Sequence, residues 1–553
     1  MKKQSPLMVL GAGLLLAGCN LAPHYDQPKT DTSGSFKEAV PNGDAEAQGW
    51  KIAEPRDAAL RNTWWEAYRD TQLDDLEAKV AISNQTVAVA EANYRVARAL
   101  VGEARAALFP TVSLDPSVIR SRTSASGGSG TTSSSPTSGP TAPSTSSGSG
   151  TGPRTYFTLP LEASYEVDLW GSVRNSVAQN SYSAQASAAE VATALLSTQS
   201  AVAQDYFSLR ATDEQRRILD TTLADYEASL HLVRTLYNNG LASEEDLAEA
   251  DTQLDAAEAQ ATDLGIARAQ YEHAIAVLIG VPPAHFSVPV RPFSSALPTI
   301  PVGMPSDLLE RRPDIATAER QVAAANAGIG IARAAFFPTL SLNATAGFES
   351  TSLSQLLDWP NRFWSIGPSV AQAIFDGGLR QAATEQARAQ YDQTVANYRQ
   401  TVLAALQSVE DDLTSLRILA TEVTQQHKAA AAAQHTVQLS VVRYQNGLDS
   451  YVNVITAQNT FLTNRLAELQ VQLRQVTASV GLINNLGGGW DRSQWRKTED
   501  MAQNPPGAGV KPEPPAENAG PGVPNPAPLP DSVKRPEDLL KQNEQDMSPT
   551  PAR

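Results

Sequence analysis

The chain contains two copies of one unit. The phrase RAALFPTVSL at 105–114 returns as RAAFFPTLSL at 333–342, which is 228 positions later. The phrase YNNGL at 237–241 returns as YQNGL at 444–448, which is only 207 positions later. A repeat of roughly 200 residues predicts that the chain builds one object from two copies, rather than several independent domains.

The difference between these two spacings locates a loop. About 20 extra residues stand between the two phrases of the first copy, where the tract 121–153 is rich in Ser, Gly and Thr. Such a tract holds too few apolar residues to pack against a core. The sequence therefore predicts a long flexible loop in the first copy, where the second copy has a short one.

The N-terminus carries an export pattern. Lys2 and Lys3 precede an apolar run at 7–17, which is far shorter than the ~20 residues of a transmembrane helix, and the run ends in LAGC at Cys19. This pattern resembles a bacterial lipoprotein signal, which implies lipidation of Cys19 and, with Asn20 next to it, sorting to the outer membrane. An ordinary secretory signal is the alternative. Cys19 is the only cysteine of the chain, so no disulfide framework is expected.

The composition argues against several functions. The formal charge of −16 disfavours nucleic acid as a partner, because phosphate binding needs a basic face. The 6 histidines are scattered, and His427 and His435 are expected on an exposed helix face. The FDGG phrase at 375–378 lacks the lysine of a phosphate loop. We therefore expect no enzyme, no cofactor and no metal site.

Each copy also contains strands with one apolar face. In the segment 157–169 apolar and polar residues alternate strictly, and 339–348 does the same. We expect one hairpin at 111–170 and a second at 338–375. Strands of ~9 to 13 residues with such a face suit a membrane β-barrel, and half-buried hairpins of a periplasmic domain are the alternative. Four strands cannot close a barrel, so the membrane interpretation requires several chains.

Long helical segments follow both hairpins. The segments 171–239 and 378–446 are Ala-rich and nearly free of Gly and Pro, and each would reach about 100 Å as a helix. A tight turn at Gly240 or Gly447 then leads into a returning helix. The returning helices are expected at 243–279 and 450–486, and shorter helices before the hairpins at 72–108 and 306–336. Because alanine fills little central volume, a curved wall around water is favoured over a solid coiled-coil bundle.

Several phrases together resemble the TolC-like outer-membrane efflux proteins, in the lipoprotein branch that serves drug pumps. They are LAGC ending at Cys19, ALFPTVSL at 107–114 with AFFPTLSL at 335–342, EVDLWGSVR at 166–174 with IFDGGLR at 374–380, PVGMPSDLLERRPDI at 301–315, RYQNGLDSYVNVITAQ at 443–458 and LGGGW at 486–490. The resemblance implies an α+β membrane protein. It implies a homotrimer with a 12-stranded outer-membrane β-barrel, four strands per chain, continued by a long periplasmic α-helical barrel.

The same resemblance implies a function. Such a protein passively conducts drugs or other small solutes from an inner-membrane pump and a periplasmic adaptor to the outside. A type I protein-secretion duct and a lipid-anchored structural coiled-coil protein are the alternatives. The turns at Gly240 and Gly447 then form the periplasmic tip, where the helices converge to close the duct.

Gate residues are carried over from the family's tip motif. Two apolar positions fall on Leu448 and Val452, one helical turn apart. The family's aspartate position falls on Thr456, which departs from the motif, while Asp449 stands near the turn. Ordinary turn and coiled-coil packing is the alternative for these residues.

Further tip residues are expected to lock the gate or receive a partner. Arg443 and Tyr444 match positions that hold neighbouring helices together in the closed state. Glu244, Glu245 and Asp246 open the first returning helix, where we interpret them first as capping charges and second as an adaptor contact or cation rim.

The expected domain division follows the repeat. It comprises a signal peptide (1–18), an anchor and extended equatorial segment (19–70), the first repeat (71–280), an equatorial linker (281–305), the second repeat (306–490) and a disordered Pro-rich tail (491–553).

Overall fold

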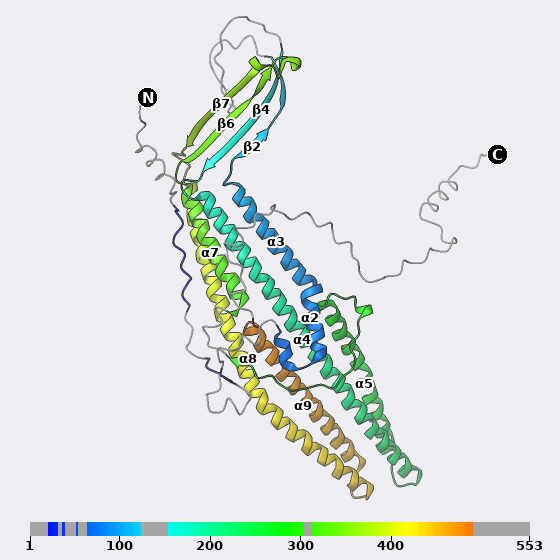
Figure 1. Cartoon of the computed structure of the whole chain (residues 1–553). Helices are drawn as coiled ribbons and strands as arrows, with labels where there is room; N and C mark the ends of the chain where they lie inside the picture. Colours follow the sequence, from blue (N-terminus) through cyan, green and yellow to red (C-terminus); the bar gives the residue numbers. More distant parts are fainter. Residues whose placement is uncertain are drawn as a thin grey trace, which may run out of the picture. The chain divides into compact units, whose positions relative to one another are not determined.

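The computed structural model describes residues 20–30, 36–38, 51–52, 63–122, 153–302 and 311–489, all within the unit Met1–Thr498 (Figure 1). Cys19 and the signal segment, most of the Ser/Gly tract and the Pro-rich tail lie outside the described residues. None of the helices described is both long and apolar enough to cross a bilayer.

Five of the described strands form one antiparallel sheet (Figure 1). It contains β2 (Thr111–Leu114), β3 (Ser117–Ser121), β4 (Arg154–Val167), β6 (Thr339–Ser350) and β7 (Arg362–Ala371) in the order β2-β4-β6-β7, with β3 also paired to β4. β2 and β3 lie in one line along β4, because Leu114 opposes Leu161 and Ser117 opposes Thr158. The interruption between them lies beside Pro160, which has no N–H to donate.

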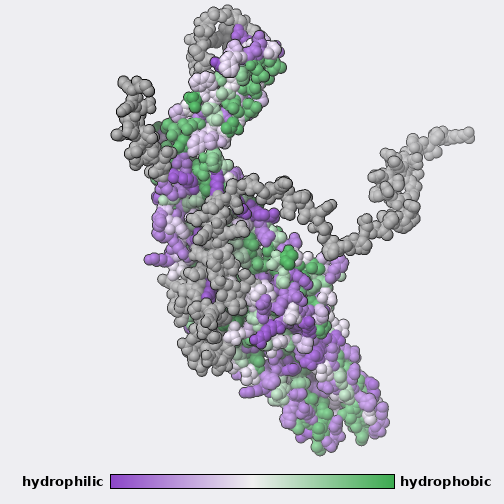
Figure 2. Space-filling model, viewed as in Figure 1, coloured by the Kyte–Doolittle hydropathy of each residue, from purple (hydrophilic) through white to green (hydrophobic). Residues whose placement is uncertain are grey.

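The register confirms the two-faced character of these strands. One row across the sheet is Leu114, Leu161, Ala346 and Trp364, all apolar. On the other face the Ser164 hydroxyl lies 3.0 Å from Asn343 Oδ1, and the Asn343 amide donates to Ser369 at 3.2 Å. Figure 2 shows hydrophobic residues gathered over the strands, where the apolar face is exposed in the single chain.

The helices of the two copies match in length. α3 (Gln85–Ala106) and α7 (Pro313–Ala334) have 22 residues each, α4 (Ser172–Asn238) and α8 (Leu379–Gln445) have 67, and α5 (Glu244–Leu278) and α9 (Tyr451–Asn485) have 35. The long helices predicted after each hairpin are therefore present, at about 100 Å each.

The prediction of a single helix at 72–108 is wrong. The segment forms two helices, α2 (Thr71–Ser83) and α3, separated by Asn84 in an extended conformation. The Asn84 side chain accepts from Val87 N at 2.9 Å, which caps α3, and donates to the Leu278 carbonyl at 2.6 Å. The helix cap and the contact with the end of α5 therefore stabilise the break.

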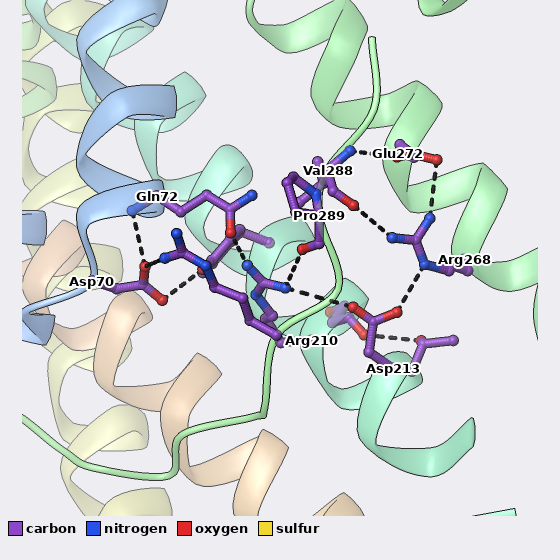
Figure 3. A network of polar contacts seen from close by, with 12 residues as sticks. Asp70, Gln72, Arg210, Asp213, Arg268, Glu272, Val288 and Pro289 are labelled. Atoms are coloured by element: carbon purple, nitrogen blue, oxygen red, sulfur yellow. Dashed lines mark hydrogen bonds and ion pairs between the residues drawn. The ribbon is translucent and has the colours of Figure 1, made fainter. Parts of the chain in front are cut away.

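A polar network holds the segment after α5 against the helices (Figure 3). Arg210 of α4 donates to the Pro289 carbonyl at 2.8 Å, and Arg268 of α5 donates to the Val288 carbonyl at 2.7 Å. Asp213 joins the two arginines, with Arg268 Nε at 2.8 Å and Arg210 Nη1 at 3.6 Å. The short elements around this level are η2 (Trp64–Tyr68), η3 (Pro283–His285) and the parallel pair β1 (Lys51–Ile52) and β5 (Pro301–Val302).

Candidate gate at the tips of the helical hairpins

Both helical hairpins turn through the same backbone motif. In the first, the N–H groups of Gly240 and Leu241 donate to the carbonyls of Tyr237 and Leu236, both at 2.8 Å. The second turn repeats this pattern around Gly447, with both bonds at 2.9 Å. The glycines have φ of 72° and 69°, and a Cβ at either would meet open space. Glycine is therefore needed for the left-handed backbone and not for lack of room.

The two apolar gate candidates are exposed in the single chain. Leu448 is 69% exposed and lies in the turn before the N-cap residue Ser450, while Val452 is 47% exposed and is the second residue of α9. The predicted spacing of one helical turn between them is therefore wrong, because Leu448 is not part of the helix. Thr456 lies one helical turn after Val452 on α9 and is also exposed. Its hydroxyl donates to the Val452 carbonyl at 2.8 Å, so this position presents a hydroxyl bound to its own helix where the family motif has a carboxylate.

Asp449 is held inside its own turn. Its carboxylate lies 3.2 Å from Arg443 Nε, accepts from Ser450 N at 3.0 Å and accepts from the Asn453 amide. The Asn453 amide and the Arg443 guanidinium hold the pKa of Asp449 below its ordinary value. Arg443 thus bonds within its hairpin, and a contact of Arg443 with a neighbouring subunit stays a prediction.

Tyr444 makes an aromatic contact rather than a hydrogen bond in the described part of the chain. Its ring centre lies 5.2 Å from that of Tyr451, and its buried hydroxyl has no hydrogen-bond partner there. Burial, and then the negative charge of Asp246 in the first tip, raise the pKa of Tyr444. Whether Tyr444 also locks a neighbouring helix stays a prediction.

The acids of the first tip cap their helix. Ser243 Oγ accepts from Asp246 N at 3.0 Å, and Asp246 Oδ2 accepts from Ser243 N at 3.1 Å. This is a capping box at the start of α5, and Glu244 and Glu245 complete an acidic first turn. The geometry matches the capping interpretation of Asp246. An adaptor contact or cation rim at these acids stays a prediction.

The sequence did not reveal how the two hairpins are joined. Tyr451 and Val454 of α9 are buried against Leu230 and Val233 of α4 and Ala250 of α5. Their spacing of three residues on the returning helix was an available signal, because it puts both on one face. This small core ties the second hairpin to the first.

A groove runs between α5 and α9 beside this core, and it too was not predicted. It has a volume of about 600 Å³, and its walls include Glu245, Glu249, Val452 and Thr456, with Tyr226 of α4 at its side. Farther from the tip, Gln458 of α9 bridges the other two helices. Its amide donates to Ser229 at 3.0 Å, and its oxygen accepts from Gln253 at 3.4 Å.

Metal ligation has no candidate in the part of the chain that the structure describes. No group of three His, Cys, Asp or Glu side chains is placed there to hold an ion. His427 is exposed and its Nδ1 lies 2.8 Å from Glu468 Oε1, between α8 and α9.

Comparison with known proteins identifies the family. The family described as "Outer membrane efflux protein" matches residues 78–281 and 304–488. The probable efflux pump outer membrane protein TtgC of Pseudomonas putida is 31% identical over 493 residues, which cover 88% of this chain and 96% of that protein. The pyoverdine export outer membrane protein OpmQ of Pseudomonas aeruginosa is 32% identical over 492 residues, covering 88% and 97%.

Solved structures show the same fold. The outer-membrane channel OprN has a TM-score of 0.76 at 26% identity, covering 85% of this chain and all of that one. The Campylobacter jejuni CmeC outer membrane channel has a TM-score of 0.77 at 22% identity. With the sheet, the long helices and the paired tips already described, these matches leave one conclusion. The chain belongs to the outer membrane efflux protein family and is an outer-membrane channel protein.

Proposed function

We propose that three copies of this chain form a passive duct that receives small solutes from an inner-membrane pump through a periplasmic adaptor. One observation carries the proposal: the sheet has a continuous apolar face and open edges at β2 and β7. Unpaired strand edges are not tolerated in lipid, so the sheet needs neighbours that close it into a barrel. Three copies supply the 12 strands that the family resemblance implies. The duct carries out no enzymatic step, and the exported solutes are drugs or other small molecules.

The closed state is proposed to depend on the second tip. Leu448 and Val452 present apolar side chains that contact little within their own chain, so symmetry-related copies of them are available to meet around the axis. Asp449 and Thr456 line the same entrance, and Arg443 and Tyr444 hold the second hairpin in place. Gly240 and Gly447 form the turns, while Glu244, Glu245 and Asp246 form an acidic rim or adaptor contact.

The double variant Leu448→Ala with Val452→Ala tests this gate. Removing both apolar side chains is expected to raise the conductance of the protein in planar bilayers several-fold. Leu241→Ala is the matched control for Leu448, because Leu241 holds the equivalent place in the first turn and is also exposed, at 75%. Unchanged closure in the double variant would remove these two residues from the gate. A protein that never permeabilises liposomes would contradict the duct itself.

Lipidation of Cys19 is also proposed. The described segment just after it lies along α7, where the Leu21 carbonyl accepts from Arg333 at 3.3 Å and the Pro23 carbonyl accepts from Asn326 at 2.9 Å. Arg333 stands shortly before β6, which begins at Thr339. Acyl chains on Cys19 would therefore reach the periplasmic leaflet beside the barrel. Mass spectrometry of the N-terminal peptide tests this, and an unmodified Cys19 would refute it. We also propose the domain division predicted from the sequence, with the first repeat at 71–280 and the second at 306–490.

A further inference from the structure

Charged residues are sorted between the two faces of the sheet. The strand acids Glu162, Glu166 and Glu349 all lie on the polar face, opposite Thr345, Ser341 and Thr158. Two strand arginines lie on the apolar face instead. Arg362 opposes Phe348, and Arg120 opposes Thr155, two residues before Phe157 on β4.

Both arginines stand where the apolar face ends, at the loop end of the sheet. Arg362 closes the row of Leu159 and Phe348 at the first residue of β7. Arg120 stands one row beyond Val118 and Phe157. Both are exposed.

Aromatic rings accompany Arg362. Its guanidinium carbon lies 3.9 Å from the ring centre of Trp359, in the loop that precedes β7. Trp364 lies two residues farther on the same face and is 73% exposed. An arginine beside exposed tryptophans is suited to the headgroup level of a bilayer, where the rings meet apolar chains and the cation meets phosphate.

At the opposite end of the sheet, where the helices begin, the arginines are paired with carboxylates. Arg174 lies 3.0 Å from Asp168, and Arg380 lies 2.5 Å from the equivalent Asp376, so the protein supplies its own counter-charge there. Within the described residues no carboxylate pairs with Arg120 or Arg362. The tract 121–153 next to Arg120 contains no Asp or Glu at all. At the loop end, Arg120 and Arg362 therefore leave two cations of the apolar face without a carboxylate partner among the described residues.

We propose that Arg362, with Trp359 and Trp364, and Arg120 bind the phosphate groups of a glycolipid in the outer leaflet. The inference rests on the proposed function, because it needs the sheet to stand in the outer membrane with its helices in the periplasm. The loop end then faces outward, where phosphorylated glycolipid is the principal anion of that leaflet. A guanidinium offers two parallel N–H donors to a phosphate, which makes the contact strong and directional.

Nanodiscs of phosphatidylethanolamine with added lipid A test the site on the full-length protein. Native mass spectrometry counts lipid A molecules retained per assembly. The double variant Arg120→Gln with Arg362→Gln is expected to weaken retention about a hundredfold, because the loss of each charge-assisted contact, worth about 1.4 kcal/mol, weakens it about tenfold. Arg154→Gln is the matched control, because Arg154 is also at the loop end but lies on the polar face, opposite Ser121.

Three outcomes would overturn the proposal. Equal loss in Arg154→Gln would show a general charge effect. Equal retention of phosphatidylglycerol would show that any lipid phosphate is accepted, and unchanged retention in the double variant would remove the site. Should the double variant fail to assemble, Arg362→Lys tests the site with the charge kept, and retention equal to the parent protein would refute the paired-donor contact. A parent protein that does not enter the bilayer refutes the proposed function instead, and so the two failures are distinguishable.

Discussion

The two hairpin tips have the same backbone conformation in their turns, but different side chains follow each turn. Residues 207 positions apart occupy equivalent places, so the acids Glu244, Glu245 and Asp246 correspond to Tyr451, Val452 and Asn453. The first returning helix opens with three acids and is capped by its own side chains, while the second opens with Tyr451 and Val452 and inserts Tyr451 into the first hairpin. The comparison teaches that a glycine turn tolerates very different residues after it. The first helix start is stabilised by its own polar side chains, and the second by burial of Tyr451 against the first hairpin.

The largest expected contrast comes from the first residue of each returning helix. Tyr451→Ala should lower the free energy of unfolding by about 3–5 kcal/mol, because it leaves a cavity between α9 and α4. Glu244→Ala, at the equivalent place, should change it by less than about 0.5 kcal/mol. Denaturant unfolding of the purified protein in detergent measures both. Similar losses in the two variants would mean that the tips are not differently anchored.

The turns themselves should respond alike. Gly240→Ala and Gly447→Ala should each cost about 1–2 kcal/mol, because both impose a left-handed backbone on a side chain. Gly265→Ala is the control: Gly265 lies inside α5 with open space around it, so alanine should instead stabilise by about 0.5–1 kcal/mol. Denaturant unfolding in detergent measures all three glycine variants. A clear difference between the two turn variants would contradict their equivalence.

The loss of stability on removing the N-cap serine should also differ between the two tips. Ser243→Ala should cost about 1 kcal/mol, because the Ser243 hydroxyl caps α5. Ser450→Ala should be close to neutral, because Ser450 makes no side-chain capping bond at the start of α9 in the described chain. Thermal unfolding monitored by circular dichroism at 222 nm compares them. An equal loss would show that Ser450 caps its helix in the assembled protein.

The smallest effect concerns pH. The pKa of Asp449 is lowered in the folded protein, so its contacts are complete above the ordinary aspartate value of about 3.9 and are lost as pH falls below it. Single-channel openings should therefore stay constant from about pH 8 to 5 and increase modestly as the pH falls further below the ordinary aspartate value.

Asp449→Asn should remove this pH response and show the increased openings already at neutral pH. Asp246→Asn, in the first tip, is the control and should keep the response. A change that already appears between neutral pH and about pH 5 would exclude an aspartate with a lowered pKa as its source.

The sequence by itself determined the features that depend on neighbouring residues. The two faces of the strands, the long helices and the glycine turns could be predicted, because each follows from the backbone geometry of neighbouring residues. The repeat could be found by comparing distant phrases of the sequence directly. The family could be named from the same phrases. The apolar character of Leu448 and Val452 was also visible, but helical spacing did not apply to them, because Leu448 lies in the turn before α9.

The tertiary structure decided the features that depend on distant partners. The break at Asn84 needs the Leu278 carbonyl, and the segment after α5 is positioned by Arg210 of α4. The burial of Tyr451 depends on Leu230, more than 200 positions away. No local pattern contains such contacts, because their free energy arises only when separate helices pack together.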